Sequence, residues 1–413
     1  MPGPEVAEEL PGAAEVDGES DSSTARVFPI AAVRHASVTS DDAVSDGVAL
    51  GATATCAACA AAAAAQVELS PVAEPGRMRD AGHCSSADVV ALWGQKSRLD
   101  ELFDAGDGGL YRQARDELDP PVRQPGQSFG NRAGCKLVEI EKALGSKGIE
   151  FVPAPGQTVF LDICGAPGAW SNYLFELGAA RGATMRGFGF SLRSGTNPLS
   201  CTWYDGLVGR KDFTPLWGAD GTGEVCAAEN LAHVAAAVGR EATIVLADGG
   251  FGVGSDEGGK HLENYQEIAC GRLLLSETLL MLDTICLGGC FICKIFDTFS
   301  HVTVGLIFVV AALFSEIFIV KPRGSRAVNS ERYLVGRGFR GADSSCFAPL
   351  RAAVKAAHAA WPTSTGGSWA SQRAPSGIVP ESLIAAEVDF SHSVRSMATA
   401  LCRRQALSLQ AAI

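Results

Sequence analysis

The stretch Val159-Phe-Leu-Asp-Ile-Cys164, followed at once by Gly165-Ala-Pro-Gly168, decides the fold of this chain. The mostly apolar run predicts a buried strand, and the glycines and proline end that strand before a helix near Trp170. Glycines at such a turn let the backbone bend tightly and approach a ligand closely. The N-terminus of the helix that follows can receive a carboxylate. The stretch therefore predicts a cofactor turn at the carboxyl end of a strand.

Strands and helices alternate on both sides of this turn, which predicts an α/β fold with helices on both faces of the sheet. We expect strands at 158–164, 184–191, 242–247, 290–296, 316–321 and 332–336, and helices at 89–103, 136–144, 170–178, 227–238, 263–287 and 301–314. The last two strands are joined without a helix, so the final strand should run antiparallel. This pattern is typical of Rossmann-like class I methyltransferases, with a mostly parallel seven-stranded sheet whose last strand is antiparallel.

Charge divides the 413 residues unequally. The formal charge is −12, but residues 1–80 alone carry 13 acidic against 4 basic side chains. We predict a disordered, acidic, alanine-rich tail over 1–86 and a single catalytic domain over 87–413. Within that domain, residues 321–340 carry six Lys or Arg side chains against Glu331 alone. This segment predicts a patch that attracts phosphates.

Two other features test for metal or membrane association. The 13 cysteines are scattered through apolar patterns, which favours reduced thiols in an intracellular protein, and neither Cys-x-x-Cys pair (Cys56/Cys59, Cys290/Cys293) favours zinc. Residues 302–320 are nearly long enough to cross a bilayer, but they divide into a buried helix and a buried strand. We expect no structural metal and no membrane span.

The glycine-rich turn suits S-adenosylmethionine as the cofactor. A nicotinamide site would favour Gly-x-Gly-x-x-Gly, whereas this turn places a proline between two glycines.

Five motifs together carry a resemblance to a known family. They are Asn131-Arg-Ala-Gly-Cys-Lys136, Leu161-Asp-Ile-Cys-Gly-Ala-Pro-Gly168, Ala247-Asp-Gly-Gly-Phe251, Phe291-Ile-Cys-Lys294 and Ser325-Arg-Ala-Val-Asn-Ser-Glu-Arg-Tyr333. With them the chain resembles the FtsJ-like RNA ribose 2'-O-methyltransferases, and within that family the cap-specific mRNA enzymes that form cap 1. The resemblance implies 5'-capped mRNA as the substrate, an N-terminal helical extension that binds cap and RNA, and a C-terminal helical tail. It also implies a nuclear location, with the cytoplasm as the alternative, and leaves protein partners unknown.

The resemblance also implies site residues. The catalytic set would be the Lys-Asp-Lys-Glu tetrad Lys136, Asp248, Lys294 and Glu331. S-adenosylmethionine would be bound by Asn131, Cys164, Gly165, Ala166, Pro167, Gly168, Ala169, Trp170, Glu224 and Val225. The cap and RNA would be bound by Lys96, Ser97, Arg98, Asp100, Arg115, Asn264, Tyr265, Gln266 and Asn329.

The tetrad suggests a mechanism. A ribose hydroxyl is a poor nucleophile, so transfer gains from a base and from fixed geometry. We expect Lys294 to be that base, with its pKa lowered by burial and by Lys136. Glu331 would orient Lys136, and Asp248 would position Lys294. The family has Gly-Gly where this chain has Gly168-Ala169, a change that matters only if residue 169 needs a positive φ.

Alternative functions remain open. Within the methyltransferases, the substrate could instead be ribosomal or transfer RNA. An inactive RNA-binding module would have lost a tetrad residue, and none is missing. A metal-dependent phosphotransferase would need several carboxylates near Asp248, and that segment supplies only one.

Overall fold

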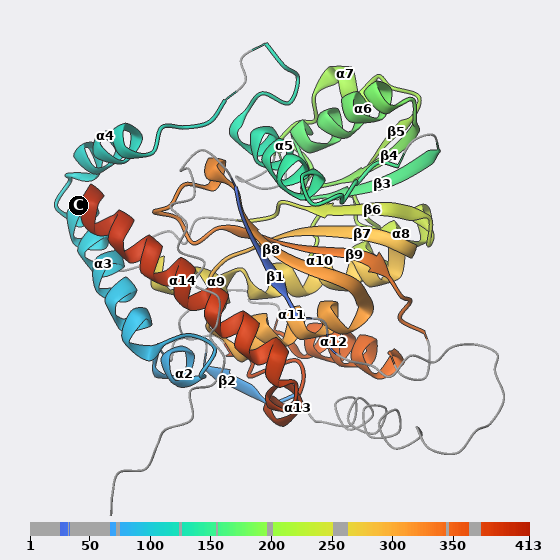
Figure 1. Ribbon diagram of the computed structural model, residues 1–413. Coiled ribbons are helices and arrows are strands. Elements are labelled where there is room, and N and C mark those ends of the chain that lie inside the picture. Colours follow the sequence, from blue (N-terminus) through green and yellow to red (C-terminus); the bar gives the residue numbers. More distant parts are fainter. Residues whose placement is uncertain are drawn as a thin grey trace, which may run out of the picture.

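The computed structural model describes residues 25–31, 33, 67–71, 75–123, 126–153, 156–195, 201–250, 263–343, 347–362 and 373–413. At its centre is a sheet of eight strands in the order β1-β8-β9-β7-β6-β3-β4-β5 (Figure 1). Its strands are β1 (Arg26–Ile30), β3 (Gln157–Ile163), β4 (Thr184–Phe190), β5 (Phe213–Leu216), β6 (Ala242–Ala247), β7 (Ile285–Ile295), β8 (Phe314–Lys321) and β9 (Arg332–Phe339). A separate pair joins β2 (Leu69–Pro71) to β10 (Arg373–Pro375).

The direction of the strands follows the prediction. Strands β7, β6, β3, β4 and β5 are parallel neighbours, and β9 runs antiparallel to both β7 and β8. Strand β9 follows β8 after a short 3-10 turn, and so short a connection cannot cross over to a parallel position. The class I α/β architecture is confirmed, with one strand more than expected.

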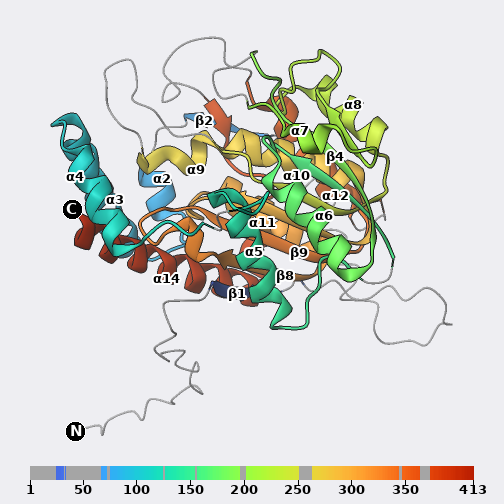
Figure 2. The same cartoon turned by 90° about the horizontal axis from the view of Figure 1, so that it is seen from above.

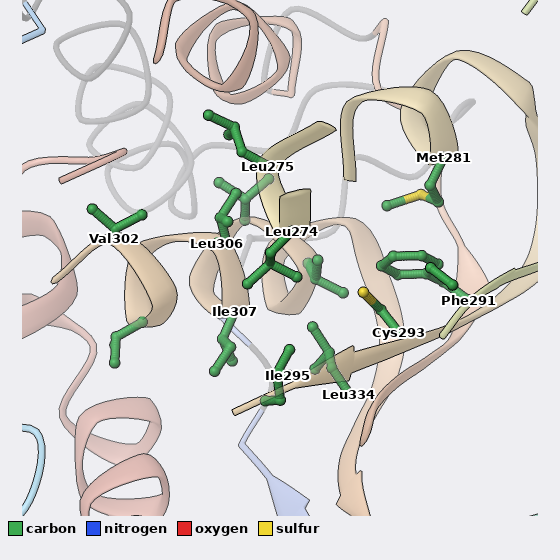
Figure 3. Packing of buried hydrophobic residues seen from close by; sticks show 14 of the residues in the cluster. Leu274, Leu275, Met281, Phe291, Cys293, Ile295, Val302, Leu306, Ile307 and Leu334 are labelled. Atoms are coloured by element: carbon green, nitrogen blue, oxygen red, sulfur yellow. The ribbon is translucent and has the colours of Figure 1, made fainter. Parts of the chain in front are cut away.

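Helices cover both faces of the sheet. On one face lie α5 (Arg132–Gly145) and α6 (Ala169–Arg181), and on the other lie α8 (Ala228–Val238), α10 (Gly271–Thr284), α11 (His301–Leu313) and α12 (Ala348–Ala360) (Figure 1). Alternate residues of β7 point to opposite faces, as the pleat requires. Phe291, Cys293 and Ile295 pack against Leu274 of α10 and its neighbours in the core under α10 and α11 (Figure 3).

The helical extension and tail lie together at one end of the sheet. Helices α2 (Pro75–Asp80), α3 (Ser86–Asp104) and α4 (Gly108–Leu118) lie between β1 and β3 in the chain, and α13 (Glu381–Ala386) and α14 (Val388–Ala412) follow the last strand of the central sheet, β9. Helix α14 packs along α3 (Figures 1 and 2). Ser85 caps α3 by accepting a hydrogen bond from the backbone N–H of Asp88, whose carboxylate bonds Arg403 of α14 at 2.9 Å. The short helices α7 (Asp205–Val208) and α9 (Gln266–Ala269) complete the chain.

The N-terminal segment departs from the prediction. Residues 1–86 were expected to be disordered, yet Arg26–Ile30 forms β1, antiparallel to β8, and 69–71 and 75–80 also form elements. The apolar run Val-Phe-Pro-Ile covers the otherwise open edge of β8, and Ile30 is buried in the core. The average composition of 80 residues concealed this five-residue strand. The division into a tail and a domain stays a prediction for the remainder.

Smaller differences have local causes. The helix expected over 263–287 is divided into a 3-10 turn (Glu263–Tyr265), α9 and α10, and β7 begins at Ile285, where the helix was expected to continue. Helix α10 begins at Gly271, where a Cβ would collide with Trp361. Strand β5 was not predicted. The apolar stretch 302–320 forms α11 and β8, as expected, and none of the described helices has the length and hydropathy of a membrane span.

Candidate active site

The four predicted catalytic residues meet at one edge of the sheet. Strand register accounts for much of this: Ala247 of β6 pairs with Cys293 of β7, so Asp248 follows beside Lys294, and Lys294 in turn pairs with Tyr333 of β9. Glu331 precedes β9 at the same edge. Lys294 Nζ lies 3.3 Å from Asp248 Oδ1. This is the edge where parallel sheets bind ligands.

The fourth residue comes from a helix. Lys136 lies in the second turn of α5, and its Nζ is 2.7 Å from Glu331 Oε1. Asn131 caps this helix, because its side-chain oxygen accepts a hydrogen bond of 2.9 Å from the backbone N–H of Gly134. The structure thus forms two ion pairs, Lys294 with Asp248 and Lys136 with Glu331, as the sequence predicted.

Tyr333 joins the two ion pairs, and sequence reasoning missed it. Its hydroxyl lies 2.9 Å from Asp248 Oδ1 and 3.3 Å from Glu331 Oε1. Ser325 donates a further hydrogen bond of 2.6 Å to Glu331 Oε1. The available signal was the spacing Glu331-Arg-Tyr333, since residues two apart on a strand share a face.

The charges of the pairs reinforce one another. Burial alone would raise the pKa of Glu331, but the attraction of Lys136 and Lys294 outweighs burial and brings this pKa to about 2. Burial likewise favours the neutral form of Lys294, yet Asp248, Glu331 and Glu277 together raise its pKa above the usual value. The prediction of a lowered pKa for Lys294 is therefore wrong for the free protein. The acids around it outweigh burial and the charge of Lys136.

The cofactor turn has the predicted geometry. Gly168 has φ 104°, and a Cβ there would collide with Leu207, so this position requires glycine. Ala169 is the first residue of α6 and lies outside the left-handed region. The Gly168-Ala169 difference from the family therefore puts no strain on the turn. The N-cap Gly168 has no side chain to cap α6, and although the buried Asp162 carboxyl accepts the backbone N–H of Ser171, the N–H groups of the first two helical residues precede that contact at the turn, where a carboxylate could bind.

Other predicted cofactor residues surround this turn. Cys164 has φ 56°, Ala166 and Pro167 complete the turn, and a Cβ at Gly165 would collide with the buried carboxyl of Asp162. Trp170 bonds the backbone oxygen of Ala133 at 2.7 Å, which ties α6 to the helix that carries Lys136. A crowded glycine turn beside an uncapped helix start fits a cofactor with a carboxylate, as S-adenosylmethionine has.

Asn131, Glu224 and Val225 were also predicted to bind the cofactor. The amide of Asn131 reaches Tyr204 Oη at 3.2 Å. Glu224 Oε1 accepts a hydrogen bond of 2.9 Å from the backbone N–H of Cys226, and Val225 is buried. Asn131 thus lies directly before α5, and Glu224 and Val225 lie in the loop between β5 and α8.

Lys96 is not available to a ligand as predicted. Its Nζ lies 2.8 Å from Asp297 Oδ2, and Arg332 Nη2 lies 2.9 Å from Asp297 Oδ1. We call Lys96, Asp297 and Arg332 the buried triad. Lys96 is drawn into the interior because Asp297, fully buried, needs cationic partners. Its predicted role in gripping the cap is therefore corrected.

The other predicted RNA and cap residues fall into two places. Ser97 Oγ accepts a hydrogen bond from Asn264 Nδ2 at 3.4 Å, which joins α3 to the 3-10 turn, and Gln266 Oε1 accepts one from Ser330 Oγ at 3.1 Å beside the tetrad. The backbone oxygen of Asn329 accepts a hydrogen bond of 2.6 Å from Lys321 Nζ.

The remaining predicted residues lie on or near the surface. Arg98 donates a hydrogen bond to Gln95 on the exposed face of α3. Asp100 on α3 and Tyr265 in the 3-10 turn are half-buried. Phe251 of the Asp-Gly-Gly-Phe motif lies outside the described residues.

A basic groove borders the tetrad. Its volume is about 290 Å³, and its charged wall residues are Arg115, Asp119, Lys321, Arg323, Arg326 and Arg404. Lys321 donates hydrogen bonds of 2.6 Å to the backbone oxygens of both Asn329 and Glu331. Desolvation lowers the pKa of Lys321 to about 7, with the charge of Arg332 in the same direction. The basic groove is therefore one hydrogen bond from the tetrad.

Arg326 is the unusual member of the basic groove. Its side chain is buried, its φ is 57°, and its Nη2 lies 2.9 Å from Asp116 Oδ1. Its Nε has no hydrogen-bond partner among the described residues. Arg115 stacks over Tyr111 and lines the same groove. A residue with a strained backbone and an unpaired guanidinium nitrogen, placed among other basic side chains, indicates an anion site.

Comparisons with known proteins agree with this geometry. The sequence model of the FtsJ-like methyltransferase family matches residues 129–339, half of the chain. Two proteins named cap-specific mRNA (nucleoside-2'-O-)-methyltransferase 1 are similar to it: that of Trypanosoma cruzi (42% identity; 61% of this chain, 68% of the relative) and that of Trypanosoma brucei brucei (39%; 61% and 66%). The human protein of the same name is 30% identical over 58% of this chain and 30% of its own length. The chain thus spans about two thirds of the trypanosome proteins and under a third of the human one. It belongs to the FtsJ-like methyltransferase family.

Proposed function

We propose that this chain transfers a methyl group from S-adenosylmethionine to the 2'-hydroxyl of the first transcribed nucleotide of 5'-capped mRNA. The family and the names of its relatives make it an RNA 2'-O-methyltransferase. The observation that favours the 5' end of a capped RNA is the basic groove. It gathers enough basic side chains to bind several phosphates, and Lys321 links it to Glu331 of the tetrad. A cap is attached through an oligophosphate.

The tetrad would hold the reacting hydroxyl. When bound, S-adenosylmethionine supplies an electrophilic methyl group on a sulfonium. Lys294 would take the proton of the hydroxyl. Asp248 fixes the position of Lys294 Nζ, and Tyr333 in turn fixes the carboxylate of Asp248. Lys294 also donates a hydrogen bond of 2.8 Å to the backbone oxygen of Asp248, which restricts its side chain further. Lys294 must lose its own proton before it can act as the base.

The basic groove would set the register of the RNA. Phosphate contacts position a nucleic acid without reading its sequence. A groove lined by five basic side chains and one acid, and linked to the tetrad by the hydrogen bond of Lys321 to the backbone oxygen of Glu331, favours the RNA end with the densest phosphate charge. Arg115 and Arg326, which sequence reasoning assigned to separate cap and downstream-phosphate sites, lie in this one groove. The capped mRNA in the names of the relatives is extended to this chain as part of the proposal, together with the nuclear location that the resemblance implies.

One experiment tests the proposal. A short RNA is prepared with and without a 5' cap, and methyl transfer from labelled S-adenosylmethionine is measured and mapped by nuclease digestion. We expect methylation of the first nucleotide of the capped RNA and little on the uncapped one. Equal methylation of both, or of an internal ribose in structured RNA, would favour the ribosomal or transfer-RNA alternative.

A further inference from the structure

A buried glutamate lies behind the catalytic lysine, and the mechanism above does not use it. Glu277 is on α10, the helix under β6 and β7, and only 1% of its surface is exposed. It shares the lining of a space of about 10 Å³ with Gly249, Lys294 and Phe296. A space of this size holds about one water molecule.

Its carboxyl packs directly against the catalytic backbone. A Cβ added at Gly249 would collide with Glu277 Oε1, so any larger residue next to Asp248 would displace this carboxyl. Oε2 accepts a weak hydrogen bond of 3.5 Å from the thiol of Cys293, and Oε1 has no hydrogen bond of good geometry within the described residues. A buried carboxyl that is so poorly satisfied is costly to retain.

One peptide group lies between Glu277 and Lys294. The peptide joining Asp248 to Gly249 presents its oxygen to Lys294 Nζ at 2.8 Å, while the backbone of Gly249 faces the carboxyl of Glu277. We infer that Glu277 is a positioning residue for Lys294: it holds this peptide in place and, through its charge, sets how readily Lys294 releases its proton. This inference rests on the proposed role of Lys294 as the base.

The charge balance around Glu277 supports this role. The ionisable groups that act on it or line its small space are Lys294, Cys293, Asp248, Cys164, Cys226, Cys270 and Glu267. Lys294 is the only cation among them. Burial raises the pKa of Glu277 to about 8 despite the attraction of Lys294, so this carboxyl changes charge in the working range. When Glu277 is ionised, its charge favours the protonated form of Lys294. When Glu277 is protonated, this effect is lost and Lys294 releases its proton more readily.

The test is the pH dependence of turnover. Glu277→Gln keeps the shape of the side chain but removes its charge, and it is compared with wild type on capped RNA between pH 6 and 10. We expect the rising limb of kcat, which reports deprotonation of Lys294, to move about one pH unit toward lower pH in the range above about pH 8, where Glu277 of the wild type is ionised, and to coincide with wild type below it. A matched control is Thr284→Ser at the far end of the same helix, whose hydroxyl donates a hydrogen bond of 2.8 Å to the backbone oxygen of Leu280, and this variant should leave the limb in place.

Each outcome decides the inference. An unchanged limb, or one moved to higher pH, in folded Glu277→Gln overturns it. If this variant does not fold, Glu277→Asp, which retains the charge but withdraws it from Gly249, should move the limb in the same direction by less. Lys294→Ala separates the two proposals: turnover by that variant would refute the base itself, whereas its inactivity together with an unmoved Glu277→Gln limb would refute only the role of Glu277.

Discussion

The tetrad and the buried triad both combine residues near the ends of β7 and β9 with a lysine from a helix, yet they differ in exposure. Lys136, Glu331, Lys294 and Asp248 keep between 9% and 15% of their side chains exposed. Lys96, Asp297 and Arg332 keep between 2% and 4%. Lys294 and Asp297 are three residues apart, and Glu331 and Arg332 are adjacent. One cluster can meet a substrate, and the other can only hold α3 to the sheet.

This difference teaches how charge is used in the fold. Breaking a buried ion pair leaves an uncompensated charge in the interior and costs about 3–5 kcal/mol, whereas a partly exposed pair can be rehydrated. The buried triad should therefore act on stability and the tetrad on turnover. The following substitutions separate the two.

The largest effect is expected from Lys294→Ala. Loss of the base should reduce methyl transfer by at least about 100-fold, because general base catalysis contributes that much or more. Affinity for S-adenosylmethionine should stay near normal, since Lys294 faces the hydroxyl and the cofactor turn lies on other elements. Single-turnover methylation and calorimetric titration measure the two quantities. A variant with full turnover would show that the tetrad does not contain the base.

Asp297→Ala tests the buried triad and should lower stability. It leaves Lys96 and Arg332 buried without an anion, so the free energy of unfolding should fall by about 3–5 kcal/mol. Chemical denaturation measures this change. The matched control is Asp248→Ala, which should change stability much less and activity much more. If the two variants lose equal stability, exposure is not what separates the clusters.

Much of this arrangement could be predicted from the sequence, and the failures have physical causes. The strand ends that carry Asp248 and Lys294 were predicted because apolar runs and glycine turns are local signals. The burial of Lys96 was not, because a helix pattern does not show which charged face will meet Asp297 some 200 residues later. Tyr333 and Glu277 were missed for the same reason: their contacts depend on strand register and helix placement, which local patterns leave open. β1 was missed because a strand of five residues is too short to stand out in a tail of 86.

A smaller and more selective effect is expected at the basic groove. Arg115→Ala should weaken capped RNA by about 10-fold, the value of one lost charge-assisted hydrogen bond, and uncapped RNA by less. The control is Arg186→Ala, an exposed arginine on β4 paired with Glu241. Binding of the two RNAs at several salt concentrations measures both effects. Equal loss for capped and uncapped RNA would make the groove a general phosphate site.

The last effect concerns stability rather than activity and involves Lys321, which is buried between the two clusters. Its pKa of about 7 in the folded chain lies below the 10.5 of an unfolded lysine, so between these values the unfolded state binds the extra proton. Stability should therefore rise with pH across this window in the wild type and rise less in Lys321→Met. The melting temperature of the wild type minus that of Lys321→Met should therefore become more positive as the pH is raised from 7 to 10. A constant difference would contradict the lowered pKa.

The pairing of β1 with β8 has a practical consequence for anyone who labels this protein. Arg26 pairs with Lys321, so β1 begins at the catalytic edge, and Ala411 near the end of α14 lines the basic groove. A purification tag joined just before Arg26 or after Ile413 would therefore be anchored beside the basic groove, where we expect a polyhistidine tag or a fused domain to compete with RNA phosphate. The exposed residues Leu287 and Gly288, near the start of β7 and thus at the opposite edge of the sheet, are the better attachment point for a reporter dye.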